Sequence, residues 1–172
     1  MPDQPELDAA SVAETLEYIA IRRLQDAYAD VVTRRAWDEL HELFLPDAAV
    51  ELDTRQGDVM RIDGPGALAD FIAGAIEQFA FFEFVTLNTR IEIAAGAHPE
   101  TAQARLYMCE LRTERDTDRW NNAFGVYHDR YARQNGRWWF AHRRYHSLAR
   151  PAPDGGTVDA FAFPNHLALG EL

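Results

Sequence analysis

Apolar side chains in the first part of the chain recur at helical spacing. From Leu16 to Val31 they fall three or four positions apart, which predicts one long helix. Just before this stripe, Ser11 and Glu14 have the spacing of a capping box, in which each side chain satisfies a free backbone N–H of the first helical turn. We therefore expect the helix to begin near Ser11 and to end at about Thr33.

Shorter apolar patterns follow before the middle of the chain. Pro46 has no backbone N–H to donate and disfavours helical geometry in Leu45, so it ends one helical stripe. A Gly-Pro-Gly break at residues 64–66 precedes another helical stripe. The elements predicted here are a helix over residues 37–44, strands over 48–53 and 59–62, and a helix over 68–79.

The second half of the chain changes to strand periodicity. Its apolar runs are rich in β-branched and aromatic residues, and turn signals such as Asn135-Gly136 separate them. Four long strands are predicted, over residues 84–94, 101–113, 122–133 and 137–148. Long strands joined by tight turns imply an antiparallel meander. The pattern therefore predicts an α+β fold, in which three N-terminal helices pack on a curved, mainly antiparallel β-sheet.

Length, charge and residue usage narrow the function classes. A chain of 172 residues has the size of a single domain, with a core over about 12–148 and a C-terminal tail over 149–172. The 17 basic and 28 acidic side chains give a net charge of −11, so neither nucleic acid nor a membrane surface is expected as a partner. Every basic residue is arginine, which excludes Schiff-base chemistry and a P-loop lysine. The start of the chain does not resemble a signal peptide, and we expect a cytoplasmic protein.

The order of elements resembles the cone-shaped fold of the nuclear-transport-factor-2-like superfamily, and local sequence is similar to its SnoaL-like branch. The similar stretches are residues 21–30, 37–40, 43–48, 125–133 and 136–143. The branch includes scytalone-type dehydratases, ketosteroid isomerases, polyketide cyclases and a dehydrochlorinase, together with non-catalytic binding and assembly domains. The resemblance therefore implies the fold and leaves open whether the chain is an enzyme.

The positions that carry catalytic groups in this family hold other residues here. The aspartate of the dehydratase-like dyad falls at Thr33, and its histidine falls at Phe84 when the chain is aligned on Asn88. The carboxylate of the ketosteroid isomerases falls at Leu52. None of these three side chains acts as a general base near neutral pH. The usual dyad chemistry is therefore not expected.

Strand alternation divides the last two predicted strands into two faces. The first face carries Gly125, Tyr127, Asp129 and Tyr131, with Trp139, Ala141, Arg143 and Tyr145. The second face carries Phe124, Val126, His128 and Arg130, with Trp138, Phe140, His142, Arg144 and His146. Periodicity does not say which face lines the cone, and the resemblance favours the first.

On that basis a few polar groups lie among apolar walls, as in many small-molecule sites. The candidate catalytic residues are Asp129, Tyr127 and Tyr28. The candidate substrate-binding residues are Arg143, Tyr145, Trp139, Thr33, Phe84, Asn88 and Leu52. Burial would raise the pKa of Asp129 towards that of a useful base, whereas pairing with Arg143 would lower it. The alternative is that Asp129 and Arg143 form a purely structural ion pair.

Other polar residues predict less chemistry. His142 and His146 lie four apart on one strand, about 13 Å from each other, which is too far for one zinc ion. His128 adds only a second ligand, so no metal site is expected, and no cofactor is implied. Glu110 and Arg112 alternate with apolar neighbours, and we expect them at the solvated end of the sheet.

The second face and the tail are candidate contact surfaces. The mixture of aromatic residues with Arg and His on the second face suits a subunit interface, which predicts a homodimer or homotrimer. Its alternative is a face covered by a helix of the same chain. The tail is apolar at Phe161 and Phe163, so we expect residues 161–164 over the mouth of the cone or on a neighbouring subunit, with Asn165 and His166 nearby. A tail laid along its own sheet is the other possibility.

Three hypotheses on function remain. The first is a cofactor-independent lyase or isomerase, dehydratase-like or cyclase-like, which acts on a small hydrophobic, cyclic molecule in the cone. The second is a non-catalytic small-molecule-binding protein, as Thr33 and Phe84 suggest. The third is an assembly subunit, similar to the small subunits of ring-hydroxylating oxygenases. A polar-lined cavity with a titrating carboxylate favours the first, an apolar cavity the second and a filled cone the third.

Overall fold

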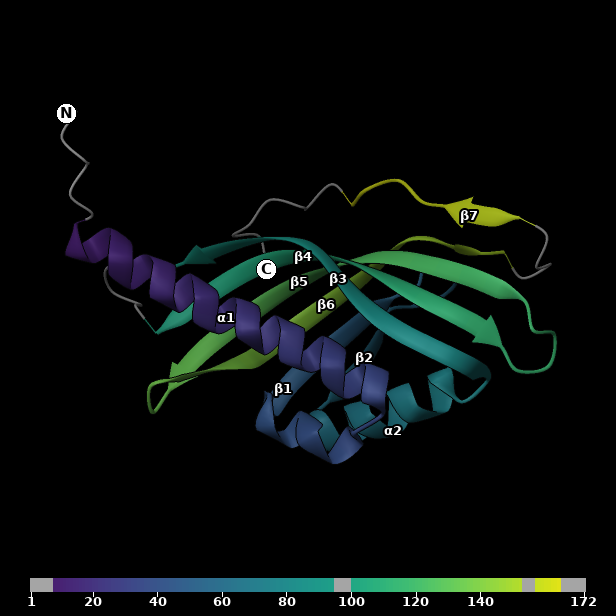
Figure 1. Cartoon of the computed structure of the whole chain (residues 1–172), viewed down its shortest axis with the longest axis horizontal. Helices are drawn as coiled ribbons and strands as arrows, with labels where there is room; N and C mark the ends of the chain where they lie inside the picture. Colours follow the sequence, from purple (N-terminus) through teal and green to yellow (C-terminus); the bar gives the residue numbers. More distant parts are fainter. Residues whose placement is uncertain (1–7, 95–99, 153–156, 165–172) are drawn as a thin grey trace, which may run out of the picture.

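The computed structural model describes residues 8–94, 100–152 and 157–164, and Figure 1 shows the arrangement of the chain. In chain order the elements are α1 (Ala9–Arg34), the 3-10 helix η1 (Trp37–Glu42), β1 (Phe44–Asp53), β2 (Met60–Asp63), α2 (Pro65–Ile76), β3 (Phe79–Ile93), β4 (Thr101–Glu114), β5 (Trp120–Gln134), β6 (Arg137–Pro151) and β7 (Val158–Ala160). No helix within these residues is long and apolar enough to cross a membrane.

The strands form one curved sheet in the order β2-β1-β6-β5-β4-β3, with β7 paired to the end of β6. All neighbours are antiparallel except β1 and β6, which run parallel. In Figure 1, α1 crosses the sheet, and η1 and α2 lie near the C-terminal end of α1. These features confirm the predicted α+β fold with helices packed on a mainly antiparallel sheet.

Several predicted boundaries were wrong for local reasons. The helix α1 begins at Ala9, because Asp8 is its N-cap and accepts a hydrogen bond from the backbone N–H of Ser11 at 2.8 Å. Pro46 lies inside β1, where the pairing with β6 is irregular and does not require its missing N–H. Helix α2 begins at Pro65, a favoured first helical position, and ends at Ile76.

A β-bulge in β6 overturns part of the predicted assignment of faces. Tyr131 pairs with Phe140 and Arg130 pairs with His142, so Ala141 is an extra residue on β6. The bulge turns Phe140 inward, where its ring stacks on that of Phe44 at 4.7 Å between centroids. Simple alternation placed Phe140 on the opposite face because it does not account for an inserted residue.

Trp138 was also predicted on the outer face, and it too lies in the core. Its indole Nε1–H donates a hydrogen bond of 2.6 Å to Glu17 on α1. The expected subunit interface therefore loses both Trp138 and Phe140. Phe124, with 41% of its surface exposed, remains on that face, and the homodimer or homotrimer stays a prediction.

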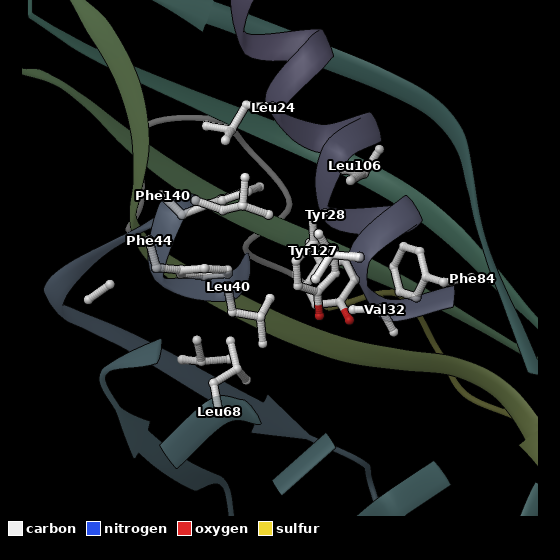
Figure 2. Close-up of a cluster of buried hydrophobic side chains, with 14 of the residues drawn as sticks. Leu24, Tyr28, Val32, Leu40, Phe44, Leu68, Phe84, Leu106, Tyr127 and Phe140 are labelled. Atoms are coloured by element: carbon white, nitrogen blue, oxygen red, sulfur yellow. The ribbon is translucent and has the colours of Figure 1, made fainter. Parts of the chain in front are cut away.

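The centre of the core is the ring of Tyr28 on α1, which touches aromatic rings from four strands. Its ring makes edge contacts at centroid distances of 5.4–6.5 Å. The partners are Phe44, Phe84, Tyr127 and Phe140, as Figure 2 shows. Edge-to-face pairs of this kind stabilise a core beyond their buried area. They fix α1 to the inner face of the sheet.

The described part of the tail lies along its own sheet. Strand β7 pairs with residues 149–151 of β6. Beyond it, the backbone N–H of Phe161 donates to the carbonyl of Leu148 at 2.9 Å, and Arg55 donates to the carbonyl of Ala162 at 3.0 Å. Asn165 and His166 lie outside the described residues. A role for residues 161–164 as a lid or a subunit contact stays a prediction.

Gly125 provides a test of packing across the sheet. A Cβ atom at this position would clash with Cε2 of the Tyr145 ring. We expect Gly125→Ala to lower the free energy of unfolding by about 1–3 kcal/mol, because the tyrosine ring must move. The measurement is urea denaturation at neutral pH.

Gly74→Ala is the matched control, since a Cβ on this residue of α2 meets nothing within 4 Å. It should leave stability unchanged or raise it by up to about 1 kcal/mol, because alanine favours the helix. Equal stabilities of the two variants would show that the Tyr145 ring does not depend on Gly125.

Candidate active site

A cavity of about 270 Å³ lies between the helices and the inner face of the sheet. Its apolar wall comes from both helices and from strands on each side: Val32, Val50, Leu52, Leu68, Phe71, Ile72, Ala75, Ile76, Phe79, Phe82, Phe84 and Ala123. Its polar groups are Tyr28, Tyr127, Tyr145, Thr54, Gln78, Glu110, Arg112 and Arg150. A mostly apolar pocket with a few convergent polar groups is typical of a small-molecule site.

Glu110 carries the only carboxylate among the described residues that line this cavity. Its side chain is 23% exposed, and Oε2 lies 3.1 Å from Nη1 of Arg112. Burial raises the pKa of Glu110, although the positive charges of Arg112 and Arg150 oppose this rise. A carboxyl group with a raised pKa in a cavity is a candidate general acid or base.

The expectation for Glu110 and Arg112 was wrong. Neither lies at the solvated end of the sheet, and Arg112 is only 8% exposed. The guanidinium donates from Nε to Oδ1 of Asn121 at 2.8 Å, and it stacks over the ring of Phe79 at 4.9 Å. Arg112 therefore has a fixed position from which it orients the Glu110 carboxylate.

Three tyrosines supply hydroxyl groups to the cavity wall. Burial raises the pKa of Tyr28, and it raises that of Tyr127 well above the ordinary value of 10.0. Burial, together with the negative charge of Glu110, raises the pKa of Tyr145 to about 12. All three hydroxyls therefore stay protonated at neutral pH, and each carries a proton that can be donated in a hydrogen bond. Figure 2 shows the rings of Tyr28 and Tyr127 side by side, with Phe84 and Val32 close by.

Asp129 and Arg143 form an ion pair that is completely buried, each with 0% of its side chain exposed. Arg143 donates from Nε and Nη2 to the two carboxylate oxygens of Asp129 at 2.7 and 2.8 Å. The hydroxyl of Tyr131 donates to the same carboxylate at 2.9 Å and accepts from Gln25 at 2.9 Å. Neither Asp129 nor Arg143 lines the cavity. This geometry favours the structural alternative for the pair.

The pair nevertheless bears on the site, because Arg143 lies against the tyrosines. Its guanidinium carbon is 4.2 Å from the ring centre of Tyr28 and 4.1 Å from that of Tyr127. Cation–π contacts of a desolvated arginine are worth up to about 2 kcal/mol each. Asp129 thus holds Arg143, and Arg143 holds the two rings that form part of the cavity wall.

Of the remaining predicted substrate-binding residues, some line the cavity or touch its wall, and others lie away from it. Leu52 and Phe84 line the cavity. Thr33 lies next to Phe84, and its Oγ1 accepts a hydrogen bond from the backbone N–H of Phe84 at 3.0 Å. Asn88 is exposed on β3. Trp139 packs instead under the guanidinium of Arg137, 4.4 Å from its ring centre.

Two of the three histidines on the outer face are buried side by side. The rings of His128 and His146 have centroids 5.6 Å apart, and Nδ1 of His146 lies 3.3 Å from Oδ2 of Asp53. His142 lies four residues before His146 on β6, 3.8 Å from Glu51. Within residues 8–94, 100–152 and 157–164, no three His, Cys, Asp or Glu side chains are grouped to hold a metal ion.

Solved structures share this arrangement of helices on a curved sheet. LinA superposes with a TM-score of 0.69 at 21% identity, over 89% of this chain and 98% of LinA. A LinA-type3 hexachlorocyclohexane dehydrochlorinase from Novosphingobium barchaimii LL02 gives 0.67 at 20% identity, over 89% and 99%. A candidate scytalone dehydratase from Novosphingobium aromaticivorans DSM 12444 gives 0.65 at 17% identity, over 88% and 91%.

The family is shown by the sequence itself. Residues 13–144 match the model of the SnoaL-like domain, and the chain belongs to this family. No curated protein matches the sequence. At identities of 17–21%, the solved structures establish the fold of this chain.

Removing one charge of the buried ion pair tests its structural role. Asp129→Asn keeps the shape of the side chain but leaves the Arg143 charge without its partner. We expect the free energy of unfolding to fall by about 3–5 kcal/mol, which is the usual cost of an uncompensated buried charge. Urea denaturation at pH 7 gives the value.

The double substitution Asp129→Leu with Arg143→Met is the control, because it removes both charges and leaves apolar side chains. It should cost less than Asp129→Asn alone. An Asp129→Asn variant as stable as the wild type would contradict a structural role for the pair.

The raised pKa of Glu110 predicts a pH dependence of stability. Between the ordinary value of 4.5 and the higher value in the fold, the folded protein binds more protons than the unfolded chain. The stability gained from protonated Glu110 is therefore lost as the pH rises through this window. We expect the unfolding free energy of the wild type, relative to Glu110→Gln, to fall as the pH rises from 4 and then to level off.

Urea denaturation at a series of pH values measures this difference. Glu83→Gln is the control, since it removes a carboxylate that is exposed on β3. A constant difference between the wild type and Glu110→Gln at every pH would show that the pKa of Glu110 is not raised by the fold.

Proposed function

We propose that the chain is a cofactor-independent lyase or isomerase that removes a proton from a small hydrophobic, cyclic substrate bound in the cavity. The observation that carries this proposal is the carboxylate of Glu110, the only one on the described wall of a mostly apolar, aromatic cavity. Burial raises the pKa of Glu110, and the Arg112 contact orients its carboxylate, which supports a role as general base. Among the three hypotheses, such a cavity favours the enzyme.

The reaction is an abstraction of a proton from a carbon next to a carbonyl group. The Glu110 carboxylate accepts the proton, and negative charge develops on the carbonyl oxygen. A hydroxyl of Tyr28, Tyr127 or Tyr145 donates a hydrogen bond to that oxygen. Protonated Glu110 then returns the proton, either to another carbon, which isomerises the substrate, or to a leaving hydroxyl group, which releases water.

In this proposal Asp129 is a positioning residue rather than the base. Both of its oxygens accept hydrogen bonds from Arg143, and it lies outside the cavity. Its contribution is to hold the Arg143 guanidinium against the rings of Tyr28 and Tyr127. The general base thus comes from β4, at a position different from those of the family dyad and of the ketosteroid isomerases.

A second candidate function is non-catalytic binding of a small molecule. Thr33 and Phe84 occupy the dyad positions and are joined by a hydrogen bond between the Thr33 Oγ1 and the Phe84 backbone. Neither of these two side chains is titratable near neutral pH. A binding protein needs the cavity and its affinity for ligands, but its function does not depend on the Glu110 carboxylate.

Two ketones distinguish the candidates. Cyclohexanone in D2O reports exchange of α-protons by NMR, and 3-hydroxycyclohexanone reports loss of water through the ultraviolet absorbance of the enone. We expect wild-type protein to accelerate exchange, and Glu110→Gln to lower the rate constant by about 10²–10⁴-fold, the usual contribution of a general base. Native mass spectrometry of the purified protein for a co-purified ligand would then direct the choice of substrate.

Glu83→Gln is again the matched control and should keep the wild-type rate. Binding of either ketone without exchange would favour the non-catalytic function. Exchange that persists at the wild-type rate in Glu110→Gln would assign the base to another residue.

A further inference from the structure

The second bulge of β6 directs an arginine into the cavity. Gly125 pairs with Ser147 and Phe124 pairs with Ala149, so Leu148 is an extra residue on β6. On a regular strand, Arg150 would point away from the side on which Tyr145 lies, since the two are five positions apart. The inserted residue reverses this direction, and Arg150 lines the same cavity as Tyr145.

The cavity therefore contains more positive than negative charge. Arg112 and Arg150 contribute two guanidinium groups, whereas Glu110 contributes one carboxylate. Arg112 is already engaged by Glu110 and Asn121. Within the part of the chain that the structure describes, no carboxylate lies within 4.0 Å of the Arg150 guanidinium, and its strand neighbour Asp159 is not on the cavity wall.

Arg150 shares the cavity wall with Glu110, Arg112 and Tyr145. Its positive charge contributes to lowering the pKa values of these three groups, behind the larger effect of burial. The polar end of the cavity is thus shared by these four side chains.

We propose that Arg112 and Arg150 form an anion subsite, and that the substrate of this protein is a small hydrophobic molecule carrying one carboxylate group. This inference rests on the function proposed above, since it specifies the substrate of the same cavity. One ligand carboxylate balances the excess positive charge of the two guanidinium groups over Glu110.

The surroundings support this class of ligand. A guanidinium presents a planar fork of N–H donors that matches a carboxylate. The rest of the cavity wall includes apolar side chains of α2 and β3, such as Phe71, Ile72 and Phe82, and suits a hydrocarbon skeleton. A chain with a net charge of −11 repels anions in general, so an anionic ligand requires local positive charge at its binding site.

Two ligands of nearly equal shape test the subsite by isothermal titration calorimetry of the full chain. Cyclohexanecarboxylate carries the charge, and cyclohexanecarboxamide lacks it. We expect the carboxylate to bind at least about tenfold more tightly at low ionic strength, with a preference that decreases as salt is added. Arg150→Gln should remove the preference and leave the affinity for the carboxamide unchanged.

Arg144→Gln is the matched control, because Arg144 is an arginine of the same strand that does not line the cavity and lies near Glu51. It should keep the preference for the carboxylate. Equal affinities for the two ligands, a preference that survives Arg150→Gln, or no binding of either ligand would each overturn the subsite. These measurements involve no turnover, so their failure leaves proton abstraction by Glu110 standing, and failure of the exchange assay leaves the subsite standing.

Discussion

The architecture of the site depends on one buried ion pair. Placing Asp129 and Arg143 in the interior is costly, because both charges lose their hydration. The structure compensates with two hydrogen bonds within the pair, a third from Tyr131, and the aromatic faces that surround the guanidinium. The pair links β5 to β6 and supports Tyr28 of α1, so helix, sheet and cavity wall share the same anchor.

Asp129 and Glu110 have different surroundings. Asp129 is enclosed, accepts hydrogen bonds from Arg143 through both oxygens and does not line the cavity, which suits a structural anion. Glu110 meets Arg112 through a single oxygen and faces the cavity, where burial raises its pKa. Enzymes commonly separate the functions of two carboxyl groups through such differences in environment.

The sequence predicted the order and type of the elements, because long strands and an amphipathic helix leave clear periodic patterns. It did not predict what each inward side chain would face. The structure brings Tyr28, Tyr127 and Tyr145 together on one cavity wall, whereas Glu110 was misplaced, since alternation along β4 does not tell core from cavity. Family resemblance did not help either, because its catalytic positions hold Thr33 and Phe84 in this chain.

The bulges of β6 explain the rest of the difference and connect the fold to its chemistry. On an unbroken strand, Phe140 and Arg150 would both lie on the side opposite to Tyr145. With one residue inserted at Ala141 and another at Leu148, the inner side of β6 presents Phe140, Arg143 and Tyr145 followed by Arg150. Bulges often occur beside functional sites, where they redirect a side chain. One strand thereby supplies an aromatic core contact, the structural cation and a cavity cation. Alternation alone places the structural cation Arg143, whereas the orientations of Phe140 and Arg150 follow from inserted residues that no periodic pattern shows.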